Sequence, residues 1–273
     1  MVLLLNRATH RLRKQWNKFD HSWRRLPDFL IIGTQKGGTT SLFDYLAQHP
    51  ELALPEIKEI NYFDRKYAKG PDWYRGFFPY RISGKKTGES TPYYLFHPLV
   101  AERVAKDLPR AKLIILLRDP VSRAFSHYQM MRKRGVEPFG SFVEAIAREE
   151  ERIQGENKKI TGKQVNWSKN LNRFSYLSRG MYASQLERWF ARFPRDQFLI
   201  LKSEDFFADP QKTLERTCDF LGLKRFTPPS LPVSNPGKYA EQPDAEAVAR
   251  LRARLQPDMD KLAGMIGPEF KWW

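Results

Sequence analysis

The chain has 273 residues, of which 47 are Lys or Arg and 31 are Asp or Glu, so its formal net charge at pH 7 is +16. Seven Trp and nineteen Phe indicate a packed core and exclude a disordered chain. The single cysteine, Cys218, excludes an internal disulfide, and no apolar run is long enough to span a membrane.

Residues 1–26 are predicted to form a basic amphipathic arm that precedes a domain over residues 27–273. Its apolar residues recur at helical spacing with arginines and lysines between them. The arm either packs its aromatic residues on the domain or lies on an acidic membrane surface, and both alternatives stay open. The apolar start, Met1–Leu5, is too short for a secretory signal, so we expect a cytoplasmic protein that is either free or peripheral to a membrane.

The first predicted element of the domain is a buried strand followed by a phosphate-binding loop. Phe29 to Ile32 is an apolar run bounded by Gly33, and a helix is predicted from Ser41 to Ala47. A strand, a small-residue loop and a helix present free N–H groups and the positive helix end to an anion. The loop adds the ammonium of Lys36 and hydroxyl groups; its candidate ligands are Lys36, Gly37, Gly38, Thr39, Thr40 and Ser41.

This loop differs from a Walker A motif, which needs Gly, four residues and then Gly-Lys-Ser/Thr. Gly33 and Gly38 have the required spacing, but Thr39 stands where the lysine belongs and the lysine comes earlier, at Lys36. The sequence therefore predicts phosphate binding by a variant of that loop.

Strands and helices alternate through the rest of the domain, which predicts an α/β fold with a parallel sheet. Further buried strands are expected at residues 113–117 and 198–201. Helices are expected at 100–108, 120–134, 141–154, 179–193, 210–221 and 245–255, the last ending at Pro257. The polar, lysine-rich segment 154–172 is predicted to be a mobile loop near the substrate entrance.

A second phosphate site is predicted where the strand at 113–117 ends. Asp119 can cap the following helix, with Pro120 at its first position. Arg118 leaves the carboxyl end of its strand, the edge at which parallel sheets bind ligands. With Ser126 it can hold a phosphate, because a guanidinium fits phosphate oxygens bidentately. The alternative is an Arg118–Asp119 structural pair.

The two motifs together resemble sulfotransferases that use 3′-phosphoadenosine 5′-phosphosulfate (PAPS). Residues 33–42 resemble their 5′-phosphosulfate loop, and residues 116–128 resemble their 3′-phosphate strand and helix. Segments at 58–63, 69–79, 88–94, 180–189 and 204–223 resemble the heparan sulfate (glucosaminyl N- and 3-O-) branch. The similarity extends from about residue 28 to the C-terminus.

This resemblance implies a P-loop-type three-layer fold, a central parallel sheet flanked by helices. It implies that residues 36–41 hold the 5′-phosphosulfate and that Arg118 and Ser126 hold the 3′-phosphate. Lys36 would also stabilise the leaving phosphate, and Glu59 stands where the branch keeps its catalytic base. A late loop over the nucleotide would comprise Gly237, Lys238 and Tyr239.

The implied reaction is in-line transfer of the sulfuryl group to a hydroxyl or amine, with PAP as the nucleotide product and no metal. The positive charge favours an anionic acceptor such as a glycan, a glycolipid or a carrier-bound metabolite. The chain lacks the cysteine pair of the animal enzymes. Two rival functions are a P-loop kinase that binds ATP with magnesium and a basic nucleic-acid-binding protein, although no known nucleic-acid-reading motif is present.

Overall fold

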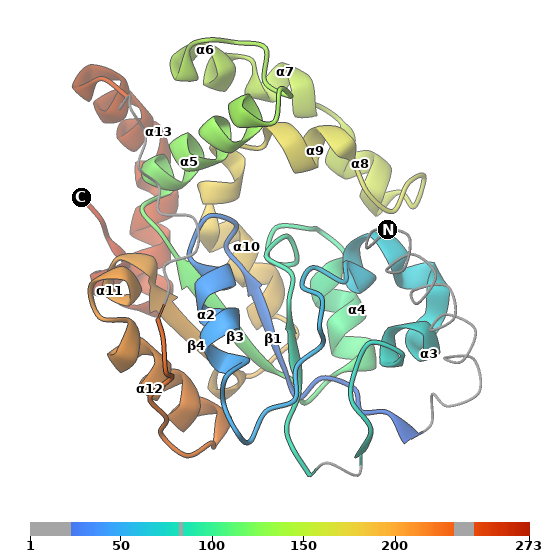
Figure 1. The fold of residues 1–273 in the computed structure, drawn as a ribbon. Helices are drawn as coiled ribbons and strands as arrows, with labels where there is room; N and C mark the ends of the chain where they lie inside the picture. The colour runs from blue at the N-terminus through green and yellow to red at the C-terminus, as the bar shows by residue number, and fades with distance from the viewer. Residues whose placement is uncertain (1–22, 82–83, 232–242) are drawn as a thin grey trace, which may run out of the picture.

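The computed structural model describes residues 23–81, 84–231 and 243–273, which are built around four parallel strands (Figure 1). The strands are β1 (Phe29–Gly33), β2 (Gly88–Ser90), β3 (Lys112–Leu117) and β4 (Phe198–Lys202). Their order in the sheet is β2-β1-β3-β4, and each neighbouring pair is parallel. All four carboxyl ends therefore lie at one edge of the sheet, and the predicted parallel sheet is confirmed.

Helices cover both faces of this sheet, because alternate strand residues point to opposite sides. Leu30, Ile32 and Leu113 pack on one face with α4 (Val100–Asp107), α10 (Tyr182–Phe190) and α13 (Ala245–Ile266). Phe29, Ile31 and Ile114 pack on the other with α2 (Thr39–Leu46), α11 (Ser203–Ala208) and α12 (Pro210–Leu221). This is the predicted three-layer α/β architecture (Figure 1).

A third cluster packs beside the sheet around α5 (Pro120–Lys133), the helix that follows β3. The remaining helices are α3 (Gly70–Arg75), α6 (Phe142–Ala147), α7 (Glu149–Ile153), α8 (Glu156–Thr161) and α9 (Lys169–Phe174). A π-helical turn, η2 (Tyr62–Lys66), precedes α3. Strand β2, which has three residues, was not expected from the sequence.

The single helix expected over residues 141–154 is two helices, α6 and α7, separated at Arg148. The break accompanies the burial of Glu149, whose carboxylate accepts the N–H groups of Leu177 and Ser178 at 2.7 and 2.9 Å. The helix expected from residue 179 begins later, at Tyr182, after a 3₁₀ turn at Ser178–Gly180.

The prediction of an irregular loop over residues 154–172 was wrong, because α8 and most of α9 lie in it. Two isolated apolar side chains, Ile160 and Leu171, are fully buried there. Ser168 caps α9 by accepting the N–H of Leu171 at 3.1 Å. Each short helix is thus anchored by a buried apolar side chain, and α9 also by a cap, although the segment as a whole is polar.

The expected helix end at Pro257 was also wrong, because α13 continues to Ile266 with the proline inside it. Proline removes one backbone hydrogen bond from a helix. Here Leu255, Met259 and Leu262 remain buried on either side of it, and Asp258 accepts the N–H of Ala183 at 3.1 Å. Tertiary packing thus outweighs the local preference.

Residues 1–22 of the arm predicted over residues 1–26 lie outside the described residues. Packing on the domain and binding to a membrane surface therefore both stay predictions. Within the part of the chain that the structure describes, none of the helices combines the length and apolar composition needed to cross a bilayer.

Candidate active site

The loop predicted to bind phosphate, called the phosphate loop below, lies between β1 and α2, at the carboxyl edge of the sheet. It packs closely on β3 and on the start of α11: the N–H of Thr34 donates to the carbonyl of Leu116 at 2.9 Å, and the hydroxyl of Ser203 donates to the carbonyl of Gly37 at 2.8 Å. A Cβ atom on Gly37 would lie 2.6 Å from the Leu116 carbonyl oxygen. Gly37 is therefore required by close approach of two backbones.

We expect Gly37→Ala to destabilise the protein by roughly 1–3 kcal/mol, because backbone oxygens cannot move away as a flexible side chain can. The measurement is the midpoint of thermal unfolding. Gly140→Ala is the matched control, since no atom lies within 4 Å of its added Cβ. Equal midpoints for the two variants would show that the loop has room for a side chain.

The N-terminus of α2 faces the site without a side-chain cap. Its N-cap residue, Gly38, has a left-handed φ of 95°, and no side chain accepts its first N–H groups. The helix begins at Thr39, two residues before the predicted start, so the hydroxyl-bearing residues 39–41 form its first turn. N–H groups without a side-chain cap, together with the helix dipole, make this end suited to binding an anion.

Lys36 and Arg118, which are 82 residues apart in the sequence, are neighbours here: Nη1 of Arg118 donates to the carbonyl of Lys36 at 3.1 Å. The pKa of Lys36 is lowered, first by burial and then by repulsion from three guanidinium groups, those of Arg118, Arg134 and Arg123. A bound anion would relieve this repulsion. The electrostatics of the loop therefore favour a negatively charged ligand.

Arg118 does not form a structural pair with Asp119, whose carboxylate instead caps α5 by accepting the N–H of Ser122 at 2.7 Å. The backbone around Arg118 is held on both sides. Its carbonyl accepts from the hydroxyl of Tyr182 at 2.8 Å, and the N–H of Asp119 donates to Glu204 at 2.8 Å. Ser126 is buried further along α5.

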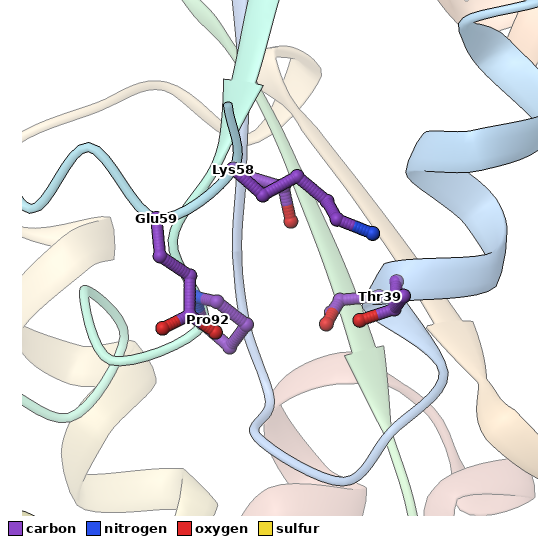
Figure 2. A pocket seen from close by; sticks show the side chains of 6 residues that line it. Thr39, Lys58, Glu59 and Pro92 are labelled. Carbon is purple, nitrogen blue, oxygen red and sulfur yellow. The ribbon is translucent and has the colours of Figure 1, made fainter. Parts of the chain in front are cut away.

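Glu59 lies across a pocket of about 300 Å³ from the start of α2 (Figure 2). The pocket is lined by Thr39, Thr40, Lys58, Glu59, Ser90 and Pro92. The backbone of Glu59 is left-handed, with φ of 54°, and its N–H donates to the Ser90 carbonyl at 2.9 Å. The structure thus brings Glu59 and the phosphate loop to one cavity.

The side chain of Lys58 points toward α2 (Figure 2). Its ammonium forms an ion pair with Asp44 of that helix at 2.8 Å. Because this pair is partly exposed, we assign it little stability. Its effect is to join the loop that carries Glu59 to the helix that begins at the phosphate site.

Sequence reasoning missed Asp64, a fully buried carboxyl group in η2, five residues after Glu59. Burial raises its pKa to about 6, and the guanidinium of Arg65, 3.5 Å away, opposes that shift. Its position shortly after Glu59 was the available signal in the sequence. That signal was too weak to use, because an acidic residue beside two aromatic ones is uninformative without the fold.

His127, the residue after Ser126 on α5, is fully buried and packs edge-on against Tyr176. Burial lowers its pKa well below the ordinary value, followed by repulsion from Arg179 and Arg123. Its buried position is consistent with a role in core packing.

Within residues 23–81, 84–231 and 243–273, no three His, Cys, Asp or Glu side chains gather as metal ligands. Gly237, Lys238 and Tyr239 lie outside the described residues.

The sequence model of the sulfotransferase domain matches residues 26–230. Human heparan sulfate glucosamine 3-O-sulfotransferase 3A1 is 32% identical over 93% of this chain and 64% of its own length. Human bifunctional heparan sulfate N-deacetylase/N-sulfotransferase 3 is 32% identical over 78% of this chain and 24% of its length. The chain thus spans less than two thirds of these curated relatives.

Among solved structures, a sulfotransferase from Alicyclobacillus acidocaldarius superposes with a TM-score of 0.73 at 31% identity, over 89% of this chain and 96% of that one. Its fold agrees with the three layers described above. The family match covers most of the chain, including β1, the phosphate loop, Glu59 and Arg118. The chain belongs to the sulfotransferase domain family.

Proposed function

We propose that this protein transfers the sulfuryl group of PAPS to a hydroxyl or amine of an anionic acceptor. One observation carries the proposal: the uncapped start of α2, Lys36 and Arg118 converge at one edge of the sheet, and Glu59 shares a pocket with Thr39 and Thr40. Cationic groups for a nucleotide and a carboxylate for an acceptor proton are the two components that this transfer needs.

The residues present fit a nucleotide that carries phosphate at both ends of its ribose. The N–H groups and hydroxyls of residues 39–41 would hold the 5′-phosphosulfate together with Lys36, Gly37 and Gly38. Arg118 and Ser126 would hold the 3′-phosphate. The mutual repulsion of Lys36, Arg118 and Arg123 supports this assignment, because cations packed together require an anion. For Gly237, Lys238 and Tyr239 the role over the nucleotide stays a prediction.

Two side chains would carry the chemistry. Glu59 accepts the proton of the attacking hydroxyl or amine, from a loop that faces the phosphate site across the pocket. Lys36 and the first N–H groups of α2 stabilise the negative charge that develops on the leaving phosphate oxygen. Since attack and departure must lie in line, placing the base opposite the phosphate loop is the geometry that the reaction requires.

Titration with PAP tests the proposal directly. We expect heat in calorimetry and a higher unfolding temperature, without magnesium, since the charge is provided by protein groups. ATP with Mg²⁺ is the comparison ligand. Stabilisation by ATP–Mg²⁺ alone would reject the proposal and favour a P-loop kinase. Salt-steep binding of DNA or RNA with no response to PAP would favour the nucleic-acid-binding alternative.

Arg118→Ala should weaken PAP binding about 10- to 150-fold, which corresponds to about 1.5–3 kcal/mol for a charge-assisted contact. The measurement is the dissociation constant by calorimetry. Arg250→Ala is the matched control, because Arg250 is an exposed arginine paired with Glu246 on α13. Equal affinity of Arg118→Ala and the unmodified protein would remove Arg118 from the 3′-phosphate site.

An anionic glycan or glycolipid is the proposed acceptor class. The net charge of +16 supports an acidic partner, and the relatives named for heparan sulfate support a glycan. Incubation with ³⁵S-labelled PAPS and fractionated extracts of the host should label a glycan-containing fraction. Label that appears only in an uncharged small-molecule fraction would contradict the acceptor class while leaving PAPS binding intact.

A further inference from the structure

Glu89, in the middle of β2, is a fully buried carboxylate that the proposed chemistry does not use. The hydroxyl of Tyr74 donates to its Oε1 at 2.8 Å, and the hydroxyl of Thr91 lies 3.4 Å from its Oε2. The hydroxyl of Tyr94 also hydrogen-bonds to it. Burying a charged carboxylate costs free energy of folding, even when it accepts several hydrogen bonds. The groups that it contacts therefore indicate its role.

Tyr94 connects this carboxylate to the loop that carries Glu59. Its hydroxyl oxygen accepts the N–H of Tyr62 at 2.9 Å and lies 3.3 Å from the N of Phe63. On the other side, the N–H of Glu59 donates to the carbonyl of Ser90, the residue that follows Glu89. The segment from Glu59 to Phe63 is therefore attached at both ends to residues 90–94.

The charge of Glu89 fixes the direction of these hydrogen bonds. A tyrosine hydroxyl has one donor and two acceptor positions. When Tyr94 accepts two backbone N–H groups, its own hydrogen must point to a further acceptor, and an ionised carboxylate only accepts. A neutral carboxyl group or an amide keeps one acceptor oxygen but adds a donor, so one of the three surrounding hydroxyls would have to turn and accept. Only the ionised form of Glu89 accepts from Tyr74, Thr91 and Tyr94 at once.

We propose that Glu89 is a positioning residue for sulfuryl transfer: its carboxylate, acting through the Tyr94 hydroxyl, holds the segment from Glu59 to Phe63 so that Glu59 faces the phosphate loop. This inference rests on the proposed function for its effect on turnover. Its effect on the loop itself can be measured without any substrate.

The cost of Glu89 to folding supports this role. Burial raises its pKa to about 7 from 4.5, and hydrogen bonds from Tyr94 and Tyr74 oppose that shift. Because the folded-state pKa is the higher one, this group costs stability that grows as the pH rises from about 4.5 to 7. The groups that interact with it are Tyr74 of α3, Thr91 and Tyr94 after β2, and Asp64 and Lys66 of η2.

Amide hydrogen exchange of Glu89→Gln tests the contact, read by mass spectrometry on a peptide spanning residues 59–64 at pH 8.5. We expect exchange in this peptide to rise about tenfold, with β1 and β3 unchanged, because the Tyr94 hydroxyl that accepts the Tyr62 and Phe63 amides is no longer held in one orientation. Tyr94→Phe keeps the buried carboxylate but removes the link, so it should show the same increase. Unchanged exchange in both variants would overturn the inference.

Turnover with the labelled acceptor fraction tests the consequence for catalysis. In Glu89→Gln we expect about tenfold lower kcat at pH 8.5, PAP affinity within twofold of the unmodified protein, and loss of the acidic decline in kcat near pH 7. Tyr74→Phe, whose lost hydrogen bond does not lead to the loop, should keep its kcat at pH 8.5 and move that decline to higher pH.

These outcomes separate the inference from the proposed function. Faster exchange with unaltered kcat would overturn the positioning role. Failure of the unmodified protein to bind PAP would instead overturn the proposed function, while the exchange data would still report on the loop. A fall in kcat and in unfolding temperature together, with no change in the pH profile, would assign Glu89 a structural role only.

Discussion

Glu59→Gln should lower kcat by roughly 10²- to 10⁴-fold, the usual effect of losing a general base. Glutamine has nearly the size and shape of glutamate, and the backbone N–H of residue 59 would still donate to the Ser90 carbonyl. The amide, however, does not accept a proton from an attacking hydroxyl or amine at neutral pH. Affinity for PAP should change little, because Glu59 lies across the pocket from the start of α2, where the nucleotide is proposed to bind.

The comparison variant is Glu56→Gln, a change of the same kind at an exposed position three residues earlier. It should keep both kcat and PAP affinity. Single-turnover measurements with preloaded PAPS separate the chemical step from product release. Turnover of Glu59→Gln equal to that of the unmodified protein would remove Glu59 from the mechanism, whatever the acceptor.

Lys36→Ala should reduce kcat by about 10²- to 10³-fold, as expected when a group that stabilises developing oxyanion charge is lost, and should weaken PAP binding as well. In the free protein, Lys36 costs stability at neutral pH, because its folded-state pKa lies below the unfolded value of 10.5. That cost disappears as the pH rises through the window between the two values. The free variant should therefore unfold at the same temperature as the unmodified protein or higher.

Opposite changes in stability and ligand affinity are the result that identifies a ligand-binding lysine. Unfolding temperature without ligand and calorimetric affinity for PAP provide the two measurements. Lys261→Ala, which removes an exposed lysine paired with Glu187, should change neither PAP affinity nor kcat. If Lys36→Ala also leaves both unchanged, the loop between β1 and α2 does not hold the nucleotide.

The core of the fold was predictable because its strands are apolar on both faces. The runs at 29–33, 113–117 and 198–201 each became a strand of the parallel sheet. Strand β2 gave no such signal, since it has three residues and its central one is Glu89. Local patterns also failed at Pro257 and over residues 154–172, where distant contacts decide the conformation.

The phosphate side of the site was more visible in the sequence than the acceptor side. Loops that bind phosphate use backbone N–H groups, so they need glycines and hydroxyl residues at fixed spacing, as at Gly37 and Gly38. Glu59 was identified only through a family resemblance. Asp64 is distinguished by its burial, and Tyr94 by hydrogen bonds to the backbone of Tyr62 and Phe63, which lie far from it along the chain; neither property has a local signature.

Both side chains to which the chemistry is assigned, Lys36 and Glu59, lie on left-handed backbone, with φ of 74° and 54°. This conformation costs a residue with a Cβ about 1–3 kcal/mol, and glycine adopts it freely. Replacing either residue with glycine should therefore raise the free energy of unfolding while removing the ammonium or the carboxylate. If the proposed roles hold, stability and activity favour different residues at these two positions, so a design that optimises stability alone would remove the proposed catalytic groups.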